Sequence, residues 1–377
     1  ALNNRRQTRI PAWPRAIRLL HRGRHGDLAD DALVLVLLAR EYPCGPEVTA
    51  AAVSRALRVG SVCEMRSLLR RSLREACESE APHDSLLRRG PRLRYDIDRS
   101  KLPPALCSSF CLLSADEATA TYISSACSLR SVLADVGSSL VAALLKLCLT
   151  HADTMALFHE TMFACSAEQA RRLLDAAGAA SCSGGSMLDV GAADGATTAR
   201  LAAATGASRV CVTEVSRLSA LRLAARGYDC AVEEQPTASA RFGLLSCLNV
   251  LDRTARPLTL LRRLSDMLAA APPGGVLLLG VALPFRPAVL AAAGCSVPPT
   301  ERLPPPLLRE RRFEESVALF ADLVLSPLGL RVSAWSRLPY LSRQIGGGVA
   351  VLDDALFCLA IDGAAGEGGQ GAGAAPE

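Results

Sequence analysis

Short apolar runs alternate with helical patterns through the C-terminal half of the chain. Such runs are typical of buried strands, whereas the segments between them repeat apolar residues three or four positions apart, as helices do. Strands are expected at 187–190, 210–213, 242–250, 276–282, 330–335 and 356–361. Helices are expected at 196–204, 216–226, 258–271 and 314–325. Strands that alternate with helices predict a doubly wound α/β sheet.

Helical patterns also occupy the region before the first of these strands. Apolar residues recur at three- and four-residue spacing over 115–134 and 136–149. Ser166 suits the N-cap of a further helix, with Glu168 and Gln169 in its first turn. That helix is expected to run to residue 180 and to end in the Ser/Gly-rich linker that follows.

The pattern divides the chain into four parts. Residues 1–94 carry no motif with chemistry and are expected to form an extension that is partly disordered. A helical cap is expected over 95–183, followed by the sheet domain over 184–361. Glycine and alanine dominate the tail at 362–377, which is expected to be disordered.

Composition and charge narrow the classes of function. Half of the 377 residues are hydrophobic, which supports a sizeable core and excludes wholesale disorder. The net charge of +5 is concentrated in residues 1–24, which hold seven arginines and no acid, so that the remainder carries −2. A near-neutral body gives no reason to expect a nucleic-acid partner. The apolar runs are far shorter than the roughly 20 residues that cross a bilayer, so no membrane span is expected.

The cysteines and histidines give no sign of a metal site. The 14 cysteines include no Cys-x-x-Cys pair, and the 5 histidines form no cluster along the sequence. Cys211 and Cys247 fall inside strand-like runs and are expected to be small buried hydrophobes. No bound metal is therefore expected.

The first candidate binding feature is the glycine-rich turn after the strand at 187–190. Ligands bind at the carboxyl ends of strands in such sheets, and small residues let a ligand approach the backbone. Gly191, Asp194 and Gly195 are therefore cofactor-binding candidates, together with Asp189 before the turn. The turn lacks the Gly-x-Gly-x-x-Gly pattern of dinucleotide sites. Asp189 would also repel a pyrophosphate, whereas it suits the cationic amino acid of S-adenosylmethionine (SAM). A dinucleotide site and an empty structural turn stay as alternatives.

Polar residues follow the next two strands. Glu214 ends the second strand, where a carboxylate can accept hydrogen bonds from both ribose hydroxyls, and Asn249 and Asp252 follow the third. Each candidate also has a purely structural alternative. Glu214 could complement the dipole of the following helix, Asp194 could cap a helix, and Asn249 could be a turn residue. Asp252 could pair with Arg253 or Arg256 on the surface. Tyr340, a further candidate in the string at 337–341, could be part of the core packing.

Two longer strings are far more specific than the glycine-rich turn. They are Ser-Cys-Leu-Asn-x-Leu-Asp-Arg at 246–253 and Arg-Leu-Pro-Tyr-Leu at 337–341. Further strings of the same kind lie at 161–169, 188–195, 212–216, 257–261, 283–287, 313–317 and 351–357. With these strings the chain resembles the protein-histidine N-pros-methyltransferases, the methyltransferase-like protein 9 or DREV family. The resemblance covers roughly residues 95–361.

The resemblance implies a class I SAM-dependent methyltransferase, with a Rossmann-like doubly wound sheet and a helical N-terminal cap. It implies SAM as methyl donor. It also implies that the acceptor is the pros nitrogen (Nδ1) of histidine in His-x-His sequences, with a small residue at x. By motif position, Glu214 would hold the ribose, Asn249 would contact the cofactor, and Tyr340 would lie close to it. Asp252 would be the catalytic residue that meets the substrate imidazole.

The sequence departs from the family pattern at three places. Ala193 stands where the family usually has glycine, so its methyl group must fit against the cofactor or the turn must shift. Arg286 stands where the family often has histidine. The proline-rich loop at 288–312 is diverged and is expected to help form the substrate groove. Peptide preference is therefore more open than methyl transfer itself.

The expected partners are protein substrates with His-x-His sequences, and the protein is expected to be a monomer. The resemblance suggests the endomembrane system, including the endoplasmic reticulum, whereas the arginine-rich start is equally typical of an organelle transit segment. Location is left open between these and the cytoplasm. Two further functions stay as alternatives: a methyltransferase with another acceptor, and a SAM-binding module without catalytic activity.

Overall fold

The computed structural model describes residues 93–126, 162–179, 184–237, 240–290, 296–309, 311–343 and 349–362. The expectations for residues 1–92, for 127–161 and for the tail after residue 362 fall outside these ranges. The helix expected at 136–149 is one of them. In the part of the chain that is described, no helix combines the length and the apolar character needed to cross a membrane.

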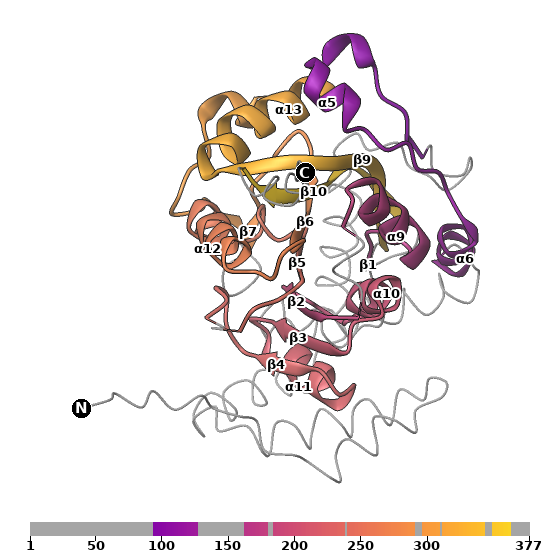
Figure 1. Ribbon diagram of the computed structural model, residues 1–377, viewed down its shortest axis with the longest axis vertical. Helices are drawn as coiled ribbons and strands as arrows, with labels where there is room; N and C mark the ends of the chain where they lie inside the picture. Colours follow the sequence, from indigo (N-terminus) through magenta and orange to yellow (C-terminus); the bar gives the residue numbers. More distant parts are fainter. Residues whose placement is uncertain are drawn as a thin grey trace, which may run out of the picture.

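Among the described residues, the centre of the molecule is an eight-stranded sheet in the order β1-β9-β10-β6-β5-β2-β3-β4 (Figure 1). Its strands are β1 (Met162–Phe163), β2 (Ser186–Val190), β3 (Arg209–Thr213), β4 (Asp229–Ala231), β5 (Leu244–Leu248), β6 (Val276–Ala282), β9 (Leu330–Arg343) and β10 (Val349–Ile361). Strands β2 to β6 pair in parallel, and β10, β9 and β1 complete one side by antiparallel pairing. The chain builds outward from β2 in both directions, so the topological switch point lies between β2 and β5. The predicted doubly wound α/β sheet is confirmed.

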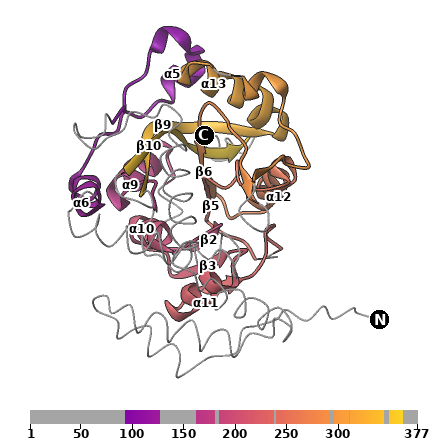
Figure 2. The same cartoon turned by 180° about the vertical axis from the view of Figure 1, so that it is seen from behind.

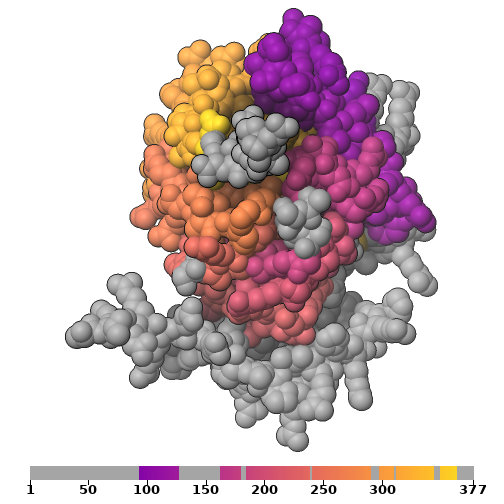
Figure 3. Space-filling model, in the orientation of Figure 1, coloured from indigo at the N-terminus to yellow at the C-terminus, as the bar shows by residue number. Residues whose placement is uncertain are grey.

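Helices cover both faces of the sheet (Figures 1 and 2). They are α5 (Pro104–Ser108), α6 (Glu117–Ala126), α9 (Ala167–Ala176), α10 (Ala196–Thr205), α11 (Arg217–Ala225), α12 (Pro257–Ala269) and α13 (Phe313–Phe320). Leu173 of α9 and Leu201 of α10 belong to the core cluster on one face. Leu264 of α12 and Phe320 of α13 belong to the cluster on the other face, together with Trp335 of β9. The space-filling view shows the segment that carries α5 lying beside the one that carries α13 (Figure 3).

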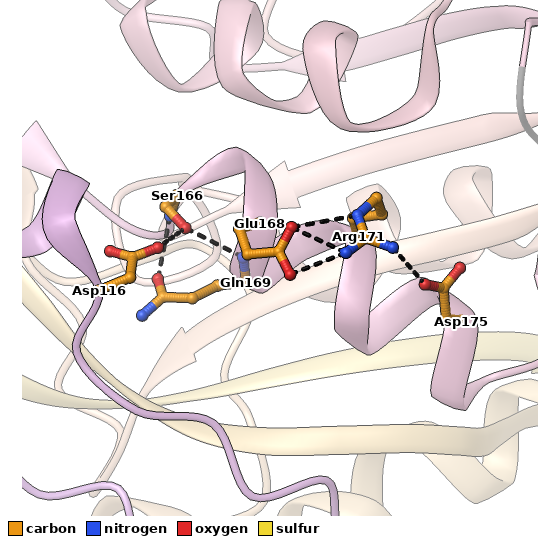
Figure 4. A network of polar contacts seen from close by, with 6 residues as sticks. All are labelled: Asp116, Ser166, Glu168, Gln169, Arg171 and Asp175. Carbon is orange, nitrogen blue, oxygen red and sulfur yellow. Dashed lines mark hydrogen bonds and ion pairs between the residues drawn. The ribbon is translucent and has the colours of Figure 1, made fainter.

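A polar network joins the start of α6 to the start of α9 (Figure 4). The Ser166 hydroxyl accepts a hydrogen bond from the Gln169 amide at 3.0 Å, and the Gln169 side chain accepts one from the Ser166 amide at 3.0 Å. This capping box is the helix start predicted from the sequence. The Asp116 carboxylate accepts hydrogen bonds from the Ser166 hydroxyl and from the Thr119 amide, so one side chain ties two helix starts together.

The structure differs from the sequence prediction at one helix end, at a short strand and at strands that contain charged residues. Helix α9 ends at Ala176, four residues earlier than expected. The three-residue strand β4 was not predicted, because it offers too few residues to form an apolar run. The two closing strands are much longer than the expected 330–335 and 356–361. Charged residues inside them, Arg337, Asp353 and Asp354, interrupt the apolar pattern although they are paired or buried in the sheet. The proline-rich loop also contains a small hairpin of β7 (Val289–Leu290) and β8 (Ser296–Val297).

Arg337 of β9 ties the N-terminal part of the described chain to the sheet. Its guanidinium contacts Asp353 on β10 at two points, 3.1 Å and 2.9 Å, and lies 3.6 Å from Glu314 of α13. It also donates to the Asp96 carbonyl at 3.1 Å and lies 4.3 Å from the centre of the Phe313 ring. Because the arginine side chain is only 7% exposed, these partners replace water almost completely.

Replacing Arg337 by methionine is expected to lower the free energy of unfolding by about 2–4 kcal/mol, because Glu314 and Asp353 would keep their charges without the cation. Urea denaturation measures this directly. Arg171→Met is the matched control, since Arg171 pairs with Glu168 and Asp175 on the open surface of α9 and is expected to change stability little. Equal losses for the two variants would contradict the role given to Arg337.

Candidate active site

The glycine-rich turn between β2 and α10 is held in left-handed backbone conformations. Gly191, Ala193 and Gly195 have φ angles of 73°, 50° and 77°. The amides of Gly191 and Ala192 both donate to the carbonyl of Thr213, at the end of β3, at 3.0 and 3.1 Å. A Cβ atom at position 191 would lie 2.6 Å from a methyl group of Val250. The turn therefore needs glycine at 191 both for its backbone angle and for its contact with the segment after β5.

Glu214 lies directly behind this turn and is buried. One of its carboxylate oxygens accepts a hydrogen bond from the Ala193 amide at 2.8 Å, and the other accepts one from the Ser216 amide at 3.0 Å. Each carboxylate oxygen can accept two hydrogen bonds, so each keeps one acceptor position. The start of the next helix, α11, has its own cap, because the Ser216 hydroxyl accepts a hydrogen bond from the Ser219 amide at 3.2 Å. Glu214 thus fixes the turn and still has acceptor capacity for a ligand.

Asp189, near the end of β2, and Asp194, in the turn, have different surroundings. Asp189 is buried, and its two oxygens accept hydrogen bonds from the hydroxyls of Ser246 on β5 and Thr198 on α10, at 2.6 and 2.5 Å. Burial raises the pKa of Asp189 to about 6, although both hydroxyls oppose the shift. Asp194 accepts the Ala196 amide at 2.9 Å, a local contact one residue before Gly195, the N-cap of α10. Cofactor contact by these two residues stays a prediction.

Asn249 and Asp354 meet across β6. Asn249 follows β5 with a φ of 56°, a conformation that asparagine tolerates better than most residues, which agrees with the turn alternative. Its side-chain nitrogen donates to a carboxyl oxygen of Asp354 on β10 at 3.0 Å. Burial raises the pKa of Asp354 to about 8; the hydrogen bond from Asn249 opposes this shift, and the charge of Asp252 adds to it. Asn249 is therefore more than a turn residue.

Asp252 and Tyr340 lie in the same neighbourhood. The side chain of Asp252 is only 13% exposed, and its carboxylate lies 3.1 Å from the Arg253 guanidinium, the pairing that the sequence left as an alternative. Burial raises the pKa of Asp252, and Arg253 opposes that shift. Burial also raises the pKa of Tyr340. The charge of Arg253 opposes this shift, and the charges of Asp252 and Asp354 add to it. Residues of β9, of β10 and of the segment after β5 thus form one polar cluster.

Most of the predicted site residues follow the carboxyl ends of β2, β3 and β5, whereas Asp189 lies inside β2 and Tyr340 inside β9. The structure also brings Asp354, which sequence reasoning missed, into contact with Asn249. Asp354 belongs to a matching string, yet no role was expected for it. The available signal was the pair Asp353-Asp354 inside an apolar strand. Successive residues of a strand face opposite sides of the sheet, and the two carboxylates accordingly have different partners, Arg337 for Asp353 and Asn249 for Asp354.

The proline-rich loop lies beside the Asp252 turn, as expected for a groove wall. The Ala288 amide donates to the Asp252 carbonyl at 2.6 Å, and the Thr300 amide donates to the Ala255 carbonyl at 2.9 Å. A cavity of about 430 Å³ opens in this segment, lined by prolines, by apolar residues that include Phe285, and by Glu301 and Arg302. Its role in substrate binding stays a prediction. In the described ranges, no three His, Cys, Asp or Glu residues are grouped so that they could hold a metal ion.

Comparisons with known proteins give a family match and several partly similar solved structures. A family model described as DREV methyltransferase matches residues 94–361. The N-methyltransferase NodS from Bradyrhizobium japonicum WM9 is 21% identical over 52% of this chain and 95% of its own, with a TM-score of 0.32. The N-terminal domain of EvdMO1, solved with SAH bound, is 18% identical over 52% of this chain and 80% of its own, with a TM-score of 0.30. A putative RNA methyltransferase from Pyrococcus horikoshii, PH1948, is 13% identical over 52% and 84%, with a TM-score of 0.33.

Ala193→Gly is expected to raise the free energy of unfolding by up to about 1 kcal/mol. The left-handed conformation costs a non-glycine residue roughly 1–2 kcal/mol, and the added freedom of glycine in the unfolded chain offsets only part of this. Ala199→Gly, on the exposed side of α10, is the matched control and should lower stability by about 1 kcal/mol. Urea denaturation of both variants checks the opposite signs, and a loss at both positions would contradict the strain assigned to Ala193.

The stability of Asp354→Asn relative to the native protein is expected to depend on pH. The pKa of Asp354 in the folded state, about 8, lies above its unfolded value near 3.9, so the folded protein binds the extra proton between these limits. The native protein must therefore lose stability relative to the variant as pH rises from 5 to 8, by at least about 1 kcal/mol. Urea denaturation across this range measures the difference. A constant difference would show that Asp354 is already ionised at pH 5.

Proposed function

Because the chain belongs to the DREV methyltransferase family and is a SAM-dependent methyltransferase, we propose that it methylates Nδ1 of histidine in proteins with His-x-His sequences. The observation that carries the proposal is the position of Asp252, a largely buried carboxylate beside Tyr340 and one turn beyond Asn249. An acid in such a place can orient an imidazole. The similarity of the strings at 246–253 and 337–341 to this family supports the same acceptor.

The residues at this edge fit SAM as the methyl donor. SAM presents hydrogen-bond donors, namely two ribose hydroxyls and an ammonium group, and it carries a cationic sulfonium. The edge presents unused acceptors: one position on each oxygen of Glu214 and the buried side-chain oxygen of Asn249, which has no hydrogen-bond partner among the described residues. In our proposal Glu214 holds the ribose, and Asn249 with Gly191 and Gly195 holds the rest of the cofactor. Asp189 and Asp194 support the turn through their hydrogen bonds to Ser246 and Thr198 and to the Ala196 amide.

The chemistry that the bound cofactor supplies is an activated methyl group, so the contribution of the protein is mainly positioning. The nucleophile must be a neutral imidazole nitrogen with a free lone pair, and histidine with a pKa near 6.5 is mostly neutral at pH 7. The carboxylate of Asp252 accepts the Nε2–H of the substrate, which leaves Nδ1 without a proton and directs its lone pair outward. This is the orienting role of the aspartate in a catalytic triad.

Arg253 completes the role of Asp252. Burial favours the protonated carboxyl, whereas the guanidinium at 3.1 Å favours the ionised form that can accept Nε2–H. The same carboxylate stabilises the positive charge that the imidazole gains when Nδ1 is methylated. Release of the Nε2 proton to solvent then returns the product to its neutral form. Methyl transfer should consequently fall at low pH, as both Asp252 and the substrate histidine become protonated.

Methyl transfer from labelled SAM to an Ala-His-Ala-His-Ala peptide tests the proposal. After hydrolysis, the label is expected in the pros isomer of methylhistidine and to be absent with a His→Ala peptide. Asp252→Ala should slow transfer by about 100-fold or more, because the tautomer is no longer fixed. SAM affinity should change by no more than about threefold, since Asp252 faces the acceptor.

Asp266→Ala, which removes an exposed carboxylate from α12, is the matched control and should transfer at the native rate. Label in the tele isomer, or full activity of Asp252→Ala, would contradict the mechanism. Absence of transfer with SAM bound would indicate a different acceptor or a non-catalytic module.

A further inference from the structure

We infer that Asp354 is a positioning residue of this site, which acts by fixing the side-chain amide of Asn249 so that its oxygen faces the cofactor. The inference rests on the proposed function only in taking SAM as the ligand of Asn249. It does not depend on which group accepts the methyl.

The contact between the two residues is built into the sheet. Asn249 follows β5 and Asp354 lies on β10, with β6 between them. The intervening residue is Gly280, which leaves room beside this link. A Cβ atom at that position would lie 3.3 Å from the carboxyl oxygen of Asp354 and 3.2 Å from the side chain of Leu248. The backbone amide of Asn249 also donates a hydrogen bond to the Gly280 carbonyl at 2.9 Å, which holds the backbone of Asn249 beside β6.

The hydrogen bond decides which end of the asparagine amide meets a ligand. The amide has one donor end and one acceptor end, and turning it by 180° exchanges them. Asp354 accepts from the nitrogen at 3.0 Å, so the oxygen is left on the other side. That oxygen is buried and has no hydrogen-bond partner in the described ranges. A buried acceptor without a partner is costly, and a ligand that brings a donor removes the cost.

An acceptor at this point suits the ammonium group of SAM, because its N–H groups are hydrogen-bond donors and it has no acceptor. Without Asp354, nothing on the described residues would hold the nitrogen end in place. The amide could then turn its NH₂ group toward those donors, which would oppose binding. A hydrophobic residue at 354 would therefore harm SAM binding even if it packed well.

The test compares SAM dissociation constants, measured by calorimetry, for Asp354→Leu, Asp354→Asn and Asp353→Asn. Asp354→Leu should bind SAM at least tenfold more weakly, with folding stability equal to or above that of the native protein, because a buried carboxyl is replaced by an apolar group. Asp354→Asn keeps an acceptor oxygen and should stay within about threefold of the native affinity. Asp353→Asn, the neighbouring acid that faces Arg337 instead, should lose stability but keep its affinity for SAM.

A double-mutant cycle separates positioning from a purely structural role. If Asp354 acts through Asn249, Asp354→Leu should weaken SAM binding no further in an Asn249→Ala background. Additive losses, or native affinity in Asp354→Leu, would overturn the inference. If Asp354→Leu fails to fold, Gly280→Ala decides, because its methyl group crowds the link without removing a polar group and should weaken SAM binding. If the SAM affinities of the variants are as expected but histidine peptides are not methylated, the proposed acceptor is wrong and the inference about Asp354 still holds.

Discussion

The parallel register of β2 with β3 and β5 is the constraint on which the rest of the site depends. Val190, the last residue of β2, pairs with Thr213 at the end of β3 and with Cys247 near the end of β5. Because parallel strands in this register end at the same level, the residues that follow them emerge at one edge. The glycine-rich turn, Glu214 and Asn249 therefore meet there, although the last two are 35 positions apart in the sequence.

Buried carboxyl groups give this edge its chemical character. Burial raises the pKa of Asp189, Asp252 and Asp354, and each is stabilised by specific partners: two hydroxyls, an arginine and an asparagine amide. Acids that are buried close together repel one another's charge, so a nearby cation is favourable. A sulfonium cofactor and an imidazole that becomes cationic both meet that condition. The same arrangement would disfavour a dinucleotide, whose pyrophosphate is anionic.

The sequence was most informative where the pattern had a local physical cause, such as an apolar run that forms a buried strand or a capping residue that starts a helix. Apolar runs predicted β2, β3 and β6 closely, and the capping box predicted the start of α9. It was least informative where long-range contacts pair charged residues inside strands. Arg337 and Asp354 interrupt the pattern of β9 and β10, and only the folded sheet supplies their partners. Asp354 was missed for this reason, since its partner Asn249 lies 105 positions away across another strand.

The most direct test of this account is the equilibrium binding of SAM to the native protein and to Glu214→Ala, measured by calorimetry. The carboxylate of Glu214 is the acceptor that the parallel register brings to the turn. We expect one SAM bound per chain, at least tenfold weaker binding by Glu214→Ala, and no change for Glu168→Ala on the exposed face of α9. Equal SAM affinity of the native protein and Glu214→Ala, or binding of NADH in place of SAM, would contradict it.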